Sequence, residues 1–230
     1  MKRALLLLVA IAAPAQAQSY QCRVPRTISV PHVVPDAPPR RTPVAGYTLA
    51  VSWSPEYCRG HETSAADRIQ CSGANGRFGF VVHGLWPEGR GAFPQWCAAR
   101  PAPSPAEVRR NLCMMPFPAI QAHEWAKHGT CMNRRPETYF KLTRVLWNGL
   151  RMPDIDRLSR DPALTAGAIR QAIASANPGW RTESIGLLVN ERGWLKELRL
   201  CYGKDFMPER CDKGRFGPAD SALVKVWRGL

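Results

Sequence analysis

The sequence predicts an α+β fold in which helices flank a central antiparallel sheet and disulfide bonds staple the chain. Segments with strand and helix patterns are mixed, without the regular strand–helix–strand alternation of a parallel sheet. Two strand-like segments, 184–190 and 194–202, are joined by the turn-forming run Glu191-Arg192-Gly193, which predicts a hairpin. The 230 residues include eight cysteines, an even number that suits a disulfide framework in an exported chain.

Two further strands are expected nearer the N-terminus. Residues 47–53 alternate between apolar and polar side chains, which predicts the first strand of the core. Residues 77–83 are more apolar and predict a buried strand that ends at Gly84 and Pro87. The polar run 58–76 between them predicts a loop.

Three helices are expected from apolar periodicity. They cover residues 119–128, 136–150 and 165–176. Gly129 follows the first of these helices at the position of a C-terminal cap, and Pro136 occupies the first turn of the second. The apolar face of the second helix is predicted to consist of Tyr139, Phe140, Leu142, Val145 and Leu146.

The first residues have the pattern of a secretory signal peptide. Lys2 and Arg3 precede the apolar run 4–13, which is followed by the small-x-small site Ala15-Gln16-Ala17. Because a membrane span needs roughly 20 residues, we expect cleavage after this site, with an uncleaved anchor as the alternative. We therefore expect the chain to be secreted or periplasmic.

Proline separates a second segment from the core. A chain rich in proline cannot continue a helix or a central strand, so we expect residues 18–46 to form an extended arm. The predicted organisation is a signal peptide at 1–17, this proline-rich arm at 18–46 and one folded domain at 47–230. The six prolines between residues 23 and 46 are Pro25, Pro31, Pro35, Pro38, Pro39 and Pro43.

The chain is strongly basic, with a formal net charge of +14. Two of these charges fall in the expected signal peptide, which leaves +12 on the mature chain. Such a surplus favours polyanionic partners, namely nucleic acid or an anionic membrane. Solubility and adhesion to an acidic envelope remain open alternatives on charge alone.

The cysteines make metal and redox motifs poor explanations. No pair has the Cys-x-x-Cys spacing of zinc fingers or thioredoxin-like sites. Eight cysteines allow about 105 pairings, so the sequence by itself leaves the connectivity open. They are Cys22, Cys58, Cys71, Cys97, Cys113, Cys131, Cys201 and Cys211.

Three of the five histidines lie in two short segments that carry other reactive side chains. On a helix that advances ~100° per residue, Lys127 lies ~40°, Glu124 ~100° and His128 ~140° from His123. Two imidazoles, an ammonium and a carboxylate therefore share one face; a solvated charged face is the alternative. The segments are His83-Gly84-Leu85-Trp86-Pro87 and His123-Glu124-Trp125-Ala126-Lys127-His128-Gly129-Thr130-Cys131.

General acid–base chemistry explains these residues better than metal or serine chemistry. His123 and His128 are spaced i and i+5, whereas a helical zinc site places two histidines one turn apart at i and i+4. No Gly-x-Ser-x-Gly elbow occurs. With an ordinary pKa of ~6.5, one histidine can be neutral while another is protonated. RNA supplies its own nucleophile, the 2′-hydroxyl, and needs only a base, an acid and cations near phosphorus.

The two histidine segments together resemble the active-site segments of the ribonuclease T2 family. They occur in the same order, roughly 40 residues apart, and a looser resemblance extends from Tyr47 to Cys211. The resemblance implies that residues 47–230 form a T2-like catalytic domain. It implies an endoribonuclease that produces 2′,3′-cyclic phosphates and then 3′-phosphates, with broad base preference and no metal or other cofactor.

The resemblance also assigns roles to individual side chains. His83 would be the general acid and His128 the general base. His123 would bind phosphate, while Glu124 and Lys127 would stabilise the pentacovalent transition state. The expected partner is RNA, bound by a monomer with no membrane span.

Base-binding residues are less well defined by the same resemblance. Trp86 corresponds to an aromatic residue on which a base stacks, Glu88 to an acid that contacts the base, and Phe93 is a further stacking candidate. Core packing of Trp86 and a solvated carboxylate at Glu88 are the alternatives. The family often has an aromatic residue three positions before the first histidine of the second segment, where this chain has Ile120.

Disulfide pairs follow from the family pattern as well. It implies Cys97–Cys131, Cys201–Cys211 and Cys58–Cys71, and leaves Cys22–Cys113 as the fourth pair. The alternative function for the whole chain is a non-catalytic basic protein that binds nucleic acid or associates with the envelope.

Overall fold

The computed structural model describes residues 19–20 and 22–229 and has the α+β architecture expected from the sequence. The expected signal peptide, residues 1–17, lies outside the described residues. Across the described part of the chain, no helix combines the length and apolarity that crossing a bilayer requires. A small separate sheet pairs β1 (Ser19–Tyr20) with β3 (Arg77–Phe78).

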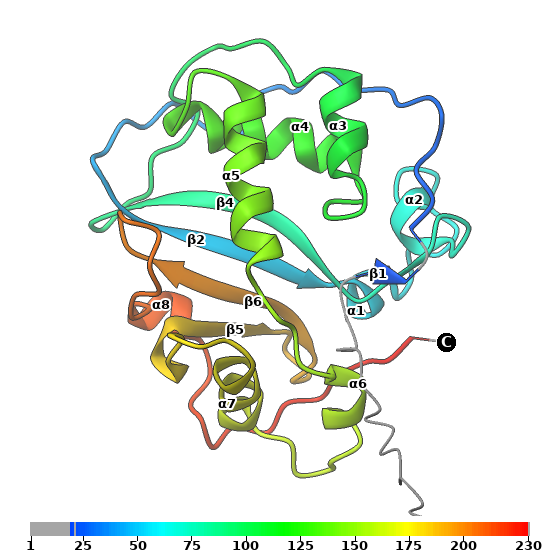
Figure 1. Ribbon diagram of the computed structural model, residues 1–230, viewed down its shortest axis with the longest axis vertical. Helices are drawn as coiled ribbons and strands as arrows, with labels where there is room; N and C mark the ends of the chain where they lie inside the picture. The colour runs from blue at the N-terminus through cyan, green and yellow to red at the C-terminus, as the bar shows by residue number, and fades with distance from the viewer. Residues whose placement is uncertain (1–18, 21, 230) are drawn as a thin grey trace, which may run out of the picture.

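The central sheet is fully antiparallel, with the strand order β4-β2-β6-β5. Hydrogen bonds thus place β2 and β6 inside the sheet and leave β4 and β5 at the two edges (Figure 1). The strands are β2 (Val44–Trp53), β4 (Phe80–Gly89), β5 (Ile185–Val189) and β6 (Leu195–Tyr202).

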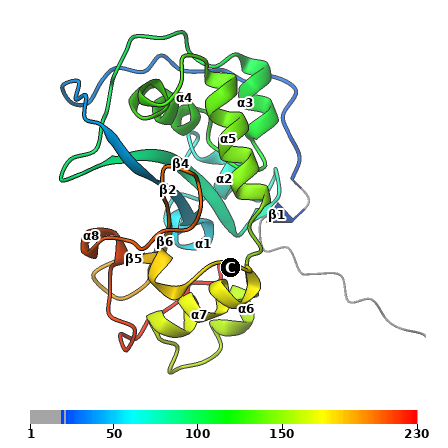
Figure 2. The same cartoon turned by 60° about the vertical axis from the view of Figure 1, so that its left-hand side comes forward.

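Helices lie beyond both edges of this sheet (Figures 1 and 2). On the β4 side are α3 (Pro105–Asn111), α4 (Pro118–Lys127) and α5 (Pro136–Asn148). On the β5 side are α6 (Ile155–Leu158) and α7 (Ala166–Ala176). The shorter elements are α1 (Ser54–Cys58), α2 (Arg68–Cys71), α8 (Lys213–Phe216) and the 3-10 turns η1 (Gly129–Cys131) and η2 (Thr182–Ser184).

The hydrophobic core joins the sheet to helices on both sides. Alternate residues of β2 and β4, such as Leu49 and Val82, point into it, and Trp125 of α4 and Phe140 of α5 meet them. Ile169 of α7 is part of the same buried cluster. Burial of such side chains stabilises the fold by roughly 1.5–3 kcal/mol each, so the core holds α4 firmly against the sheet.

The free edge of β4 is covered by hydrogen bonds from the helical side. Tyr139 of α5 is fully buried, and its hydroxyl both accepts from the amide of Leu85 (3.1 Å) and donates to its carbonyl (3.2 Å). The amide of Val82 donates to the carbonyl of Met114 at 2.8 Å. These bonds satisfy backbone groups that an edge strand would otherwise expose, and they fix the segment that contains His83.

One extra residue in β4 decides which side chains share a face. Ala50 of β2 pairs with Gly84 and Val51 pairs with Val82, so His83 has no partner and forms a β-bulge. Without a bulge, residues 83 and 86 would point to opposite faces, because side chains alternate along a strand. With it, the rings of His83 and Trp86 lie edge to face, with centroids 5.2 Å apart.

Three local expectations were wrong. The strand does not end at Gly84 or Pro87 but continues to Gly89, since an edge strand tolerates proline. Gly129 does not cap α4 in a left-handed conformation; it begins η1, and a Cβ there would lie 2.4 Å from the ring of Trp125. Val145 is 60% exposed, because it lies ~240° around α5 from Tyr139.

Four disulfides join the same cysteine pairs that the family resemblance implied. Cys97–Cys131 connects the loop after β4 to η1, directly after helix α4. Cys22–Cys113 anchors the start of the proline-rich segment, whose Ile28 is buried against α3. The other two bonds are Cys58–Cys71 and Cys201–Cys211.

Replacing Tyr139 by Phe tests the clamp on β4. The substitution keeps the ring but leaves the buried Leu85 amide without its donor–acceptor partner, so we expect a loss of about 1–3 kcal/mol in unfolding free energy. Urea denaturation measures this loss. Tyr47→Phe is the control, because burial is the only influence on its hydroxyl among the described residues and no hydrogen bond is lost; an equal effect of both changes would contradict the clamp.

Candidate active site

His83 stands between two carboxylates on the face opposite the core. Its Nδ1 lies 2.8 Å from Oε2 of Glu197 on β6, and its Nε2 lies 3.8 Å from Oε1 of Glu124 on α4. Both carboxylates are nearly inaccessible to solvent, whereas the His83 side chain is 36% exposed. The imidazole is therefore held by a hydrogen bond at Nδ1, while its Nε2 faces Glu124 without a hydrogen bond and one side of the ring faces solvent.

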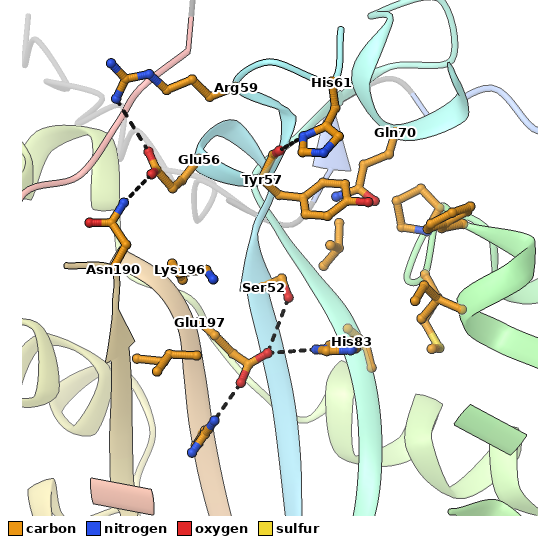
Figure 3. A pocket seen from close by; sticks show the side chains of 18 of the residues that line it. Ser52, Glu56, Tyr57, Arg59, His61, Gln70, His83, Asn190, Lys196 and Glu197 are labelled. Carbon is orange, nitrogen blue, oxygen red and sulfur yellow. Dashed lines mark hydrogen bonds and ion pairs between the residues drawn. The ribbon is translucent and has the colours of Figure 1, made fainter. Parts of the chain in front are cut away.

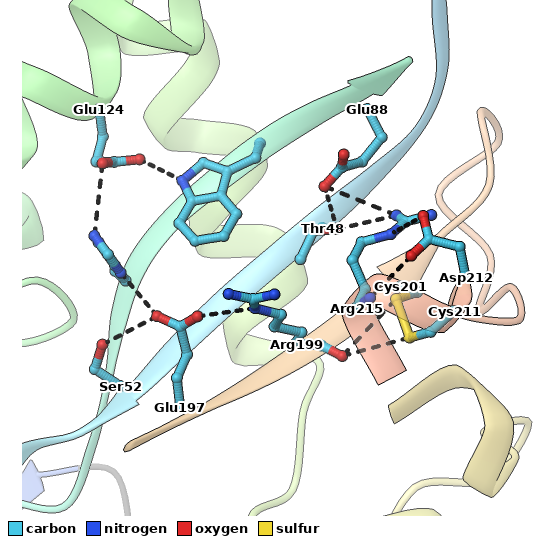
Figure 4. A network of polar contacts seen from close by, with 12 residues as sticks. Thr48, Ser52, Glu88, Glu124, Glu197, Arg199, Cys201, Cys211, Asp212 and Arg215 are labelled. Carbon is cyan, nitrogen blue, oxygen red and sulfur yellow. Dashed lines mark hydrogen bonds and ion pairs between the residues drawn. A yellow bond between two sulfur atoms is a disulfide. The ribbon is translucent and has the colours of Figure 1, made fainter. Parts of the chain in front are cut away.

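Glu124 connects helix α4 to β4, the strand that carries His83. Its Oε2 accepts a hydrogen bond of 2.6 Å from the indole of Trp86, and its other oxygen faces His83 (Figure 4). A Cβ on Gly84 would lie 2.0 Å from the Glu124 carboxylate. Glycine between the histidine and the tryptophan is thus required for α4 to approach β4 this closely.

His128 is the C-terminal cap residue of α4 and contacts the same indole. Its ring centroid is 5.7 Å from that of Trp86 and 5.9 Å from that of Phe93. The side chain is buried, and no described residue forms a hydrogen bond with its Nδ1. Trp86 therefore contacts both of the histidines that the sequence singled out as acid and base.

Lys127 and His123 add positive charge beside His128, but the arm partly offsets it. Asp36 accepts a hydrogen bond of 2.8 Å from Lys127 and one of 3.0 Å from the indole of Trp96. The same carboxylate lies 4.0 Å from Nε2 of His123. The proline-rich segment thus brings an acidic side chain to the expected phosphate-binding groups.

The local environment moves the two key histidines in opposite directions. Burial, together with the charges of Lys127 and His123, lowers the pKa of His128 to about 3. Burial alone would also lower the pKa of His83, but its hydrogen bond with Glu197 and the charges of Glu124 and Glu197 raise it above the ordinary value. Around weakly acidic pH, His83 is therefore protonated and His128 neutral.

The two carboxylates that flank His83 also differ. Burial raises the pKa of Glu124 to about 7, against the opposing effects of His83 and of the hydrogen bond from Trp86. Burial acts in the same direction on Glu197, but its hydrogen bond and charge interaction with His83 hold its pKa below the usual range. Glu197 is hence a fixed negative charge, whereas Glu124 can gain or lose a proton near neutrality.

A cavity of about 600 Å³ opens beside His83 and does not include His128 among its lining residues. Its walls combine aromatic and apolar side chains, including Tyr57, Phe117 and Ile120, with the cations of Arg59 and Lys196 (Figure 3). Such a mixture suits a planar apolar group that carries a negative charge. The position where the family often has an aromatic residue, Ile120, lies on this wall.

The predicted base-contacting residues have different surroundings. Glu88 accepts a 2.6 Å hydrogen bond from Thr48 and lies 3.8 Å from a guanidinium nitrogen of Arg215 (Figure 4). Phe93 is 38% exposed, and the guanidinium of Arg40 stacks over its ring at 4.9 Å. Glu88 is thus held within the protein, whereas Phe93 offers an open aromatic face near His128.

No group of three or more histidine, cysteine, aspartate or glutamate side chains in the described residues is arranged to hold a metal ion. The site groups that the structure adds to the sequence predictions are Glu197 and Asp36. Glu197 lies 114 residues from His83, and Asp36 lies 91 residues from Lys127. No local spacing marks such partners, so only the fold reveals them.

Comparison with known proteins shows which protein family the chain resembles. Residues 45–160 match the Ribonuclease T2 family. A probable ribonuclease of Haemophilus influenzae is 31% identical over 185 residues, which cover 74% of this chain and 62% of that protein. A ribonuclease of Aeromonas hydrophila is 32% identical over 166 residues, which cover 69% of this chain and 72% of that protein.

Solved structures have the same fold. An RNase-related protein from Calystegia sepium has a TM-score of 0.62 at 21% identity, covering 80% of this chain and 98% of that one. Trichomaglin, described as an S-like ribonuclease, has a TM-score of 0.58 at 24% identity, covering 74% and 92%. The chain belongs to the ribonuclease T2 family. It spans about three fifths of the Haemophilus relative, 62%.

Asp36→Asn tests the contact between the arm and α4. The charge of Asp36 raises the pKa of His123 against burial and Lys127, so its removal should shift the His123 titration to lower pH by several tenths of a unit. NMR titration of the imidazole measures the shift. Asp156→Asn, on the surface of α6, is the control; an unmoved His123 titration in the Asp36 variant would refute the contact.

Proposed function

We propose that this protein is an endoribonuclease that cleaves single-stranded RNA by transphosphorylation, with His83 as general acid and His128 as general base. The observation that carries the proposal is the pair of opposite pKa shifts on two histidines that contact the same indole, that of Trp86. Acid–base catalysis requires one protonated and one neutral group at the same pH.

In the first step, His128 accepts the proton of the 2′-hydroxyl while its oxygen forms a bond to phosphorus. The bond from phosphorus to the 5′-oxygen breaks, and His83 donates its Nε2 proton to that leaving oxygen. The products are a 2′,3′-cyclic phosphate and a free 5′-hydroxyl. Water then opens the cycle to a 3′-phosphate with the roles of the two histidines reversed.

Lys127, His123 and Glu124 complete the proposed phosphate site. The Lys127 ammonium would stabilise the negative charge that grows on the phosphorane oxygens. Burial and Lys127 lower the pKa of His123, so this residue would bind phosphate as a neutral hydrogen-bond donor. Glu124 is protonated about half of the time near pH 7 and could then donate a hydrogen bond to the same oxygens. A bound phosphate would also raise the low pKa of His128, because a nearby negative charge favours the protonated imidazole. Substrate binding thus makes His128 a stronger base.

The direction of the RNA follows from the place of the acid. His83 protonates the leaving 5′-oxygen and lines the large cavity, so the nucleoside on the leaving side would enter that cavity. The nucleoside that supplies the 2′-hydroxyl would lie toward Phe93, next to His128, while Trp86 lines the cavity and borders both positions. Stacking on aromatic side chains tolerates any base, which favours broad base preference.

The remaining properties agree with an RNA substrate. The net charge of +14 favours association with a polyanion before any specific contact forms. The four disulfides suit the secreted or periplasmic location that the N-terminal sequence predicts. We propose that the enzyme acts there as a monomer and without a cofactor.

Substitution of either histidine tests the assignment. His83→Ala and His128→Ala should each fold normally but lower kcat on RNA by about 10²- to 10⁴-fold, because each removes one proton-transfer group. Product analysis by mass spectrometry should show cyclic phosphate ends for the wild type. His32→Ala, at an exposed histidine of the arm, is the matched control.

The same assay separates the rival explanations. EDTA should leave the wild-type rate unchanged, and DNA should bind without being cut, because it lacks the 2′-hydroxyl. Full activity in both histidine variants, or shifted but intact RNA with the wild type, would reject the proposal and favour a binding protein.

The pH dependence gives an independent test. Since the pKa of His128 is about 3 and that of His83 is raised, kcat/KM should stay nearly constant from about pH 4.5 to 6.5. It should fall above that range, as His83 loses the proton that it must donate. A steep loss of activity on going from pH 6.5 to 5 would contradict the assignment, because it would mean that the base titrates normally.

A further inference from the structure

We propose that Glu197 is a positioning residue of this site, one that holds His83 with Nδ1–H toward β6 and keeps its Nε2 proton available to the leaving oxygen. The inference rests on the proposed function, because it gives Glu197 a role through the general acid. Glu197 itself touches His83 and not the reacting phosphate.

The contact spans three strands on one face of the sheet. His83 is on β4, Ser52 is on the central strand β2, and Glu197 on β6 pairs directly with Ser52. The small side chain at Ser52 leaves room for the Glu197 carboxylate to cross over β2 and reach His83 at 2.8 Å (Figure 3). A larger residue in the middle strand would block this path.

The surroundings of the Glu197 carboxylate favour its ionised form. This side chain is 6% exposed, and its hydrogen-bond partners among the described residues are all donors: His83 on Oε2, Ser52 on Oε2 at 3.5 Å, and Arg199 on Oε1 at 3.2 Å. A buried carboxylate without such partners would take up a proton instead. Its negative charge beside Nδ1 therefore stabilises the imidazolium form of His83, in which both ring nitrogens carry protons.

Other charged groups on β6 and α4 also affect the pKa of His83. On β6, Arg199 opposes Glu197 and lowers the pKa of His83. On α4, Glu124 raises it from 3.8 Å, while His123 and His128 repel a positive charge on His83 when they are protonated. Glu197 is the group at hydrogen-bond distance, so it fixes orientation as well as charge.

The arrangement divides two tasks between the carboxylates. Glu197 stays charged and anchors the ring from the sheet, whereas Glu124 faces the atom that transfers the proton and titrates near neutrality. Two acids in contact with one histidine, with pKa values moved apart by their surroundings, suit a donor that must be both anchored and free to react.

Glu197→Gln tests the proposal, because glutamine keeps the size and an acceptor oxygen but removes the charge. The His83 titration, followed by NMR and assigned with the His83→Ala protein, should move down by about one unit. The alkaline limb of kcat/KM should move by the same amount. At pH 9, above both titrations, the rate should fall about tenfold, and at pH 5 it should return to within about threefold of the wild type.

Two further variants provide a second test and a control. Arg199→Gln should move the His83 titration and the alkaline limb in the opposite direction, because it removes a positive charge. The Arg199 variant also tests the proposal by itself if the Glu197 variant does not fold. Glu183→Gln, a carboxylate paired with Arg181 away from the site, is the matched control and should leave both unchanged.

The outcomes separate this inference from the proposed function. A His83 titration that does not move in the Glu197 and Arg199 variants overturns the positioning role, whatever the turnover. A rate loss in Glu197→Gln that is equal at pH 5 and pH 9 overturns it too, since only a structural defect behaves so. Full activity of His83→Ala overturns the proposed function, while a shifted titration in Glu197→Gln still supports the contact.

Discussion

The single unpaired residue of β4 is the constraint on which the candidate site depends. Because His83 forms the bulge, His83 and Trp86 lie on one face of the sheet, while Val82 and Leu85 remain in the core. The absence of a side chain at Gly84 then lets Glu124 reach both rings from α4. Helix α4 and strand β4 are thus joined through the same side chains to which we assign the proposed chemistry.

Burial and charge then set the protonation states. Burial disfavours the charged form of all four groups at the site, but the net direction of each pKa shift depends on the charges beside it. The four groups are His83, His128, Glu124 and Glu197. His128 has cations beside it and stays neutral, whereas His83 has Glu197 and Glu124 beside it and stays protonated. One neutral and one protonated imidazole therefore arise beside Trp86 without any unusual residue type, as the proposed acid–base chemistry requires.

The sequence predicted what local patterns encode. The hairpin of β5 and β6, the start of α5 at Pro136 and the two histidine segments were all visible in short stretches. It could not reveal the bulge, because register depends on how β2 pairs with β4. Glu197 and Asp36 were missed because their partners are remote in the chain, and Val145 was misplaced because apolar residues also occur on exposed helix faces.

The central claim is that His83 and His128 act on one phosphate from two sides. A crystal structure with a uridine–vanadate complex, which mimics the pentacovalent phosphorane, tests it most directly. We expect the vanadium between the two imidazoles, with Nε2 of His83 near the apical oxygen that represents the leaving group and His128 near the 2′-oxygen. Vanadate bound at one histidine only, or in a pocket that neither ring reaches, would contradict the claim.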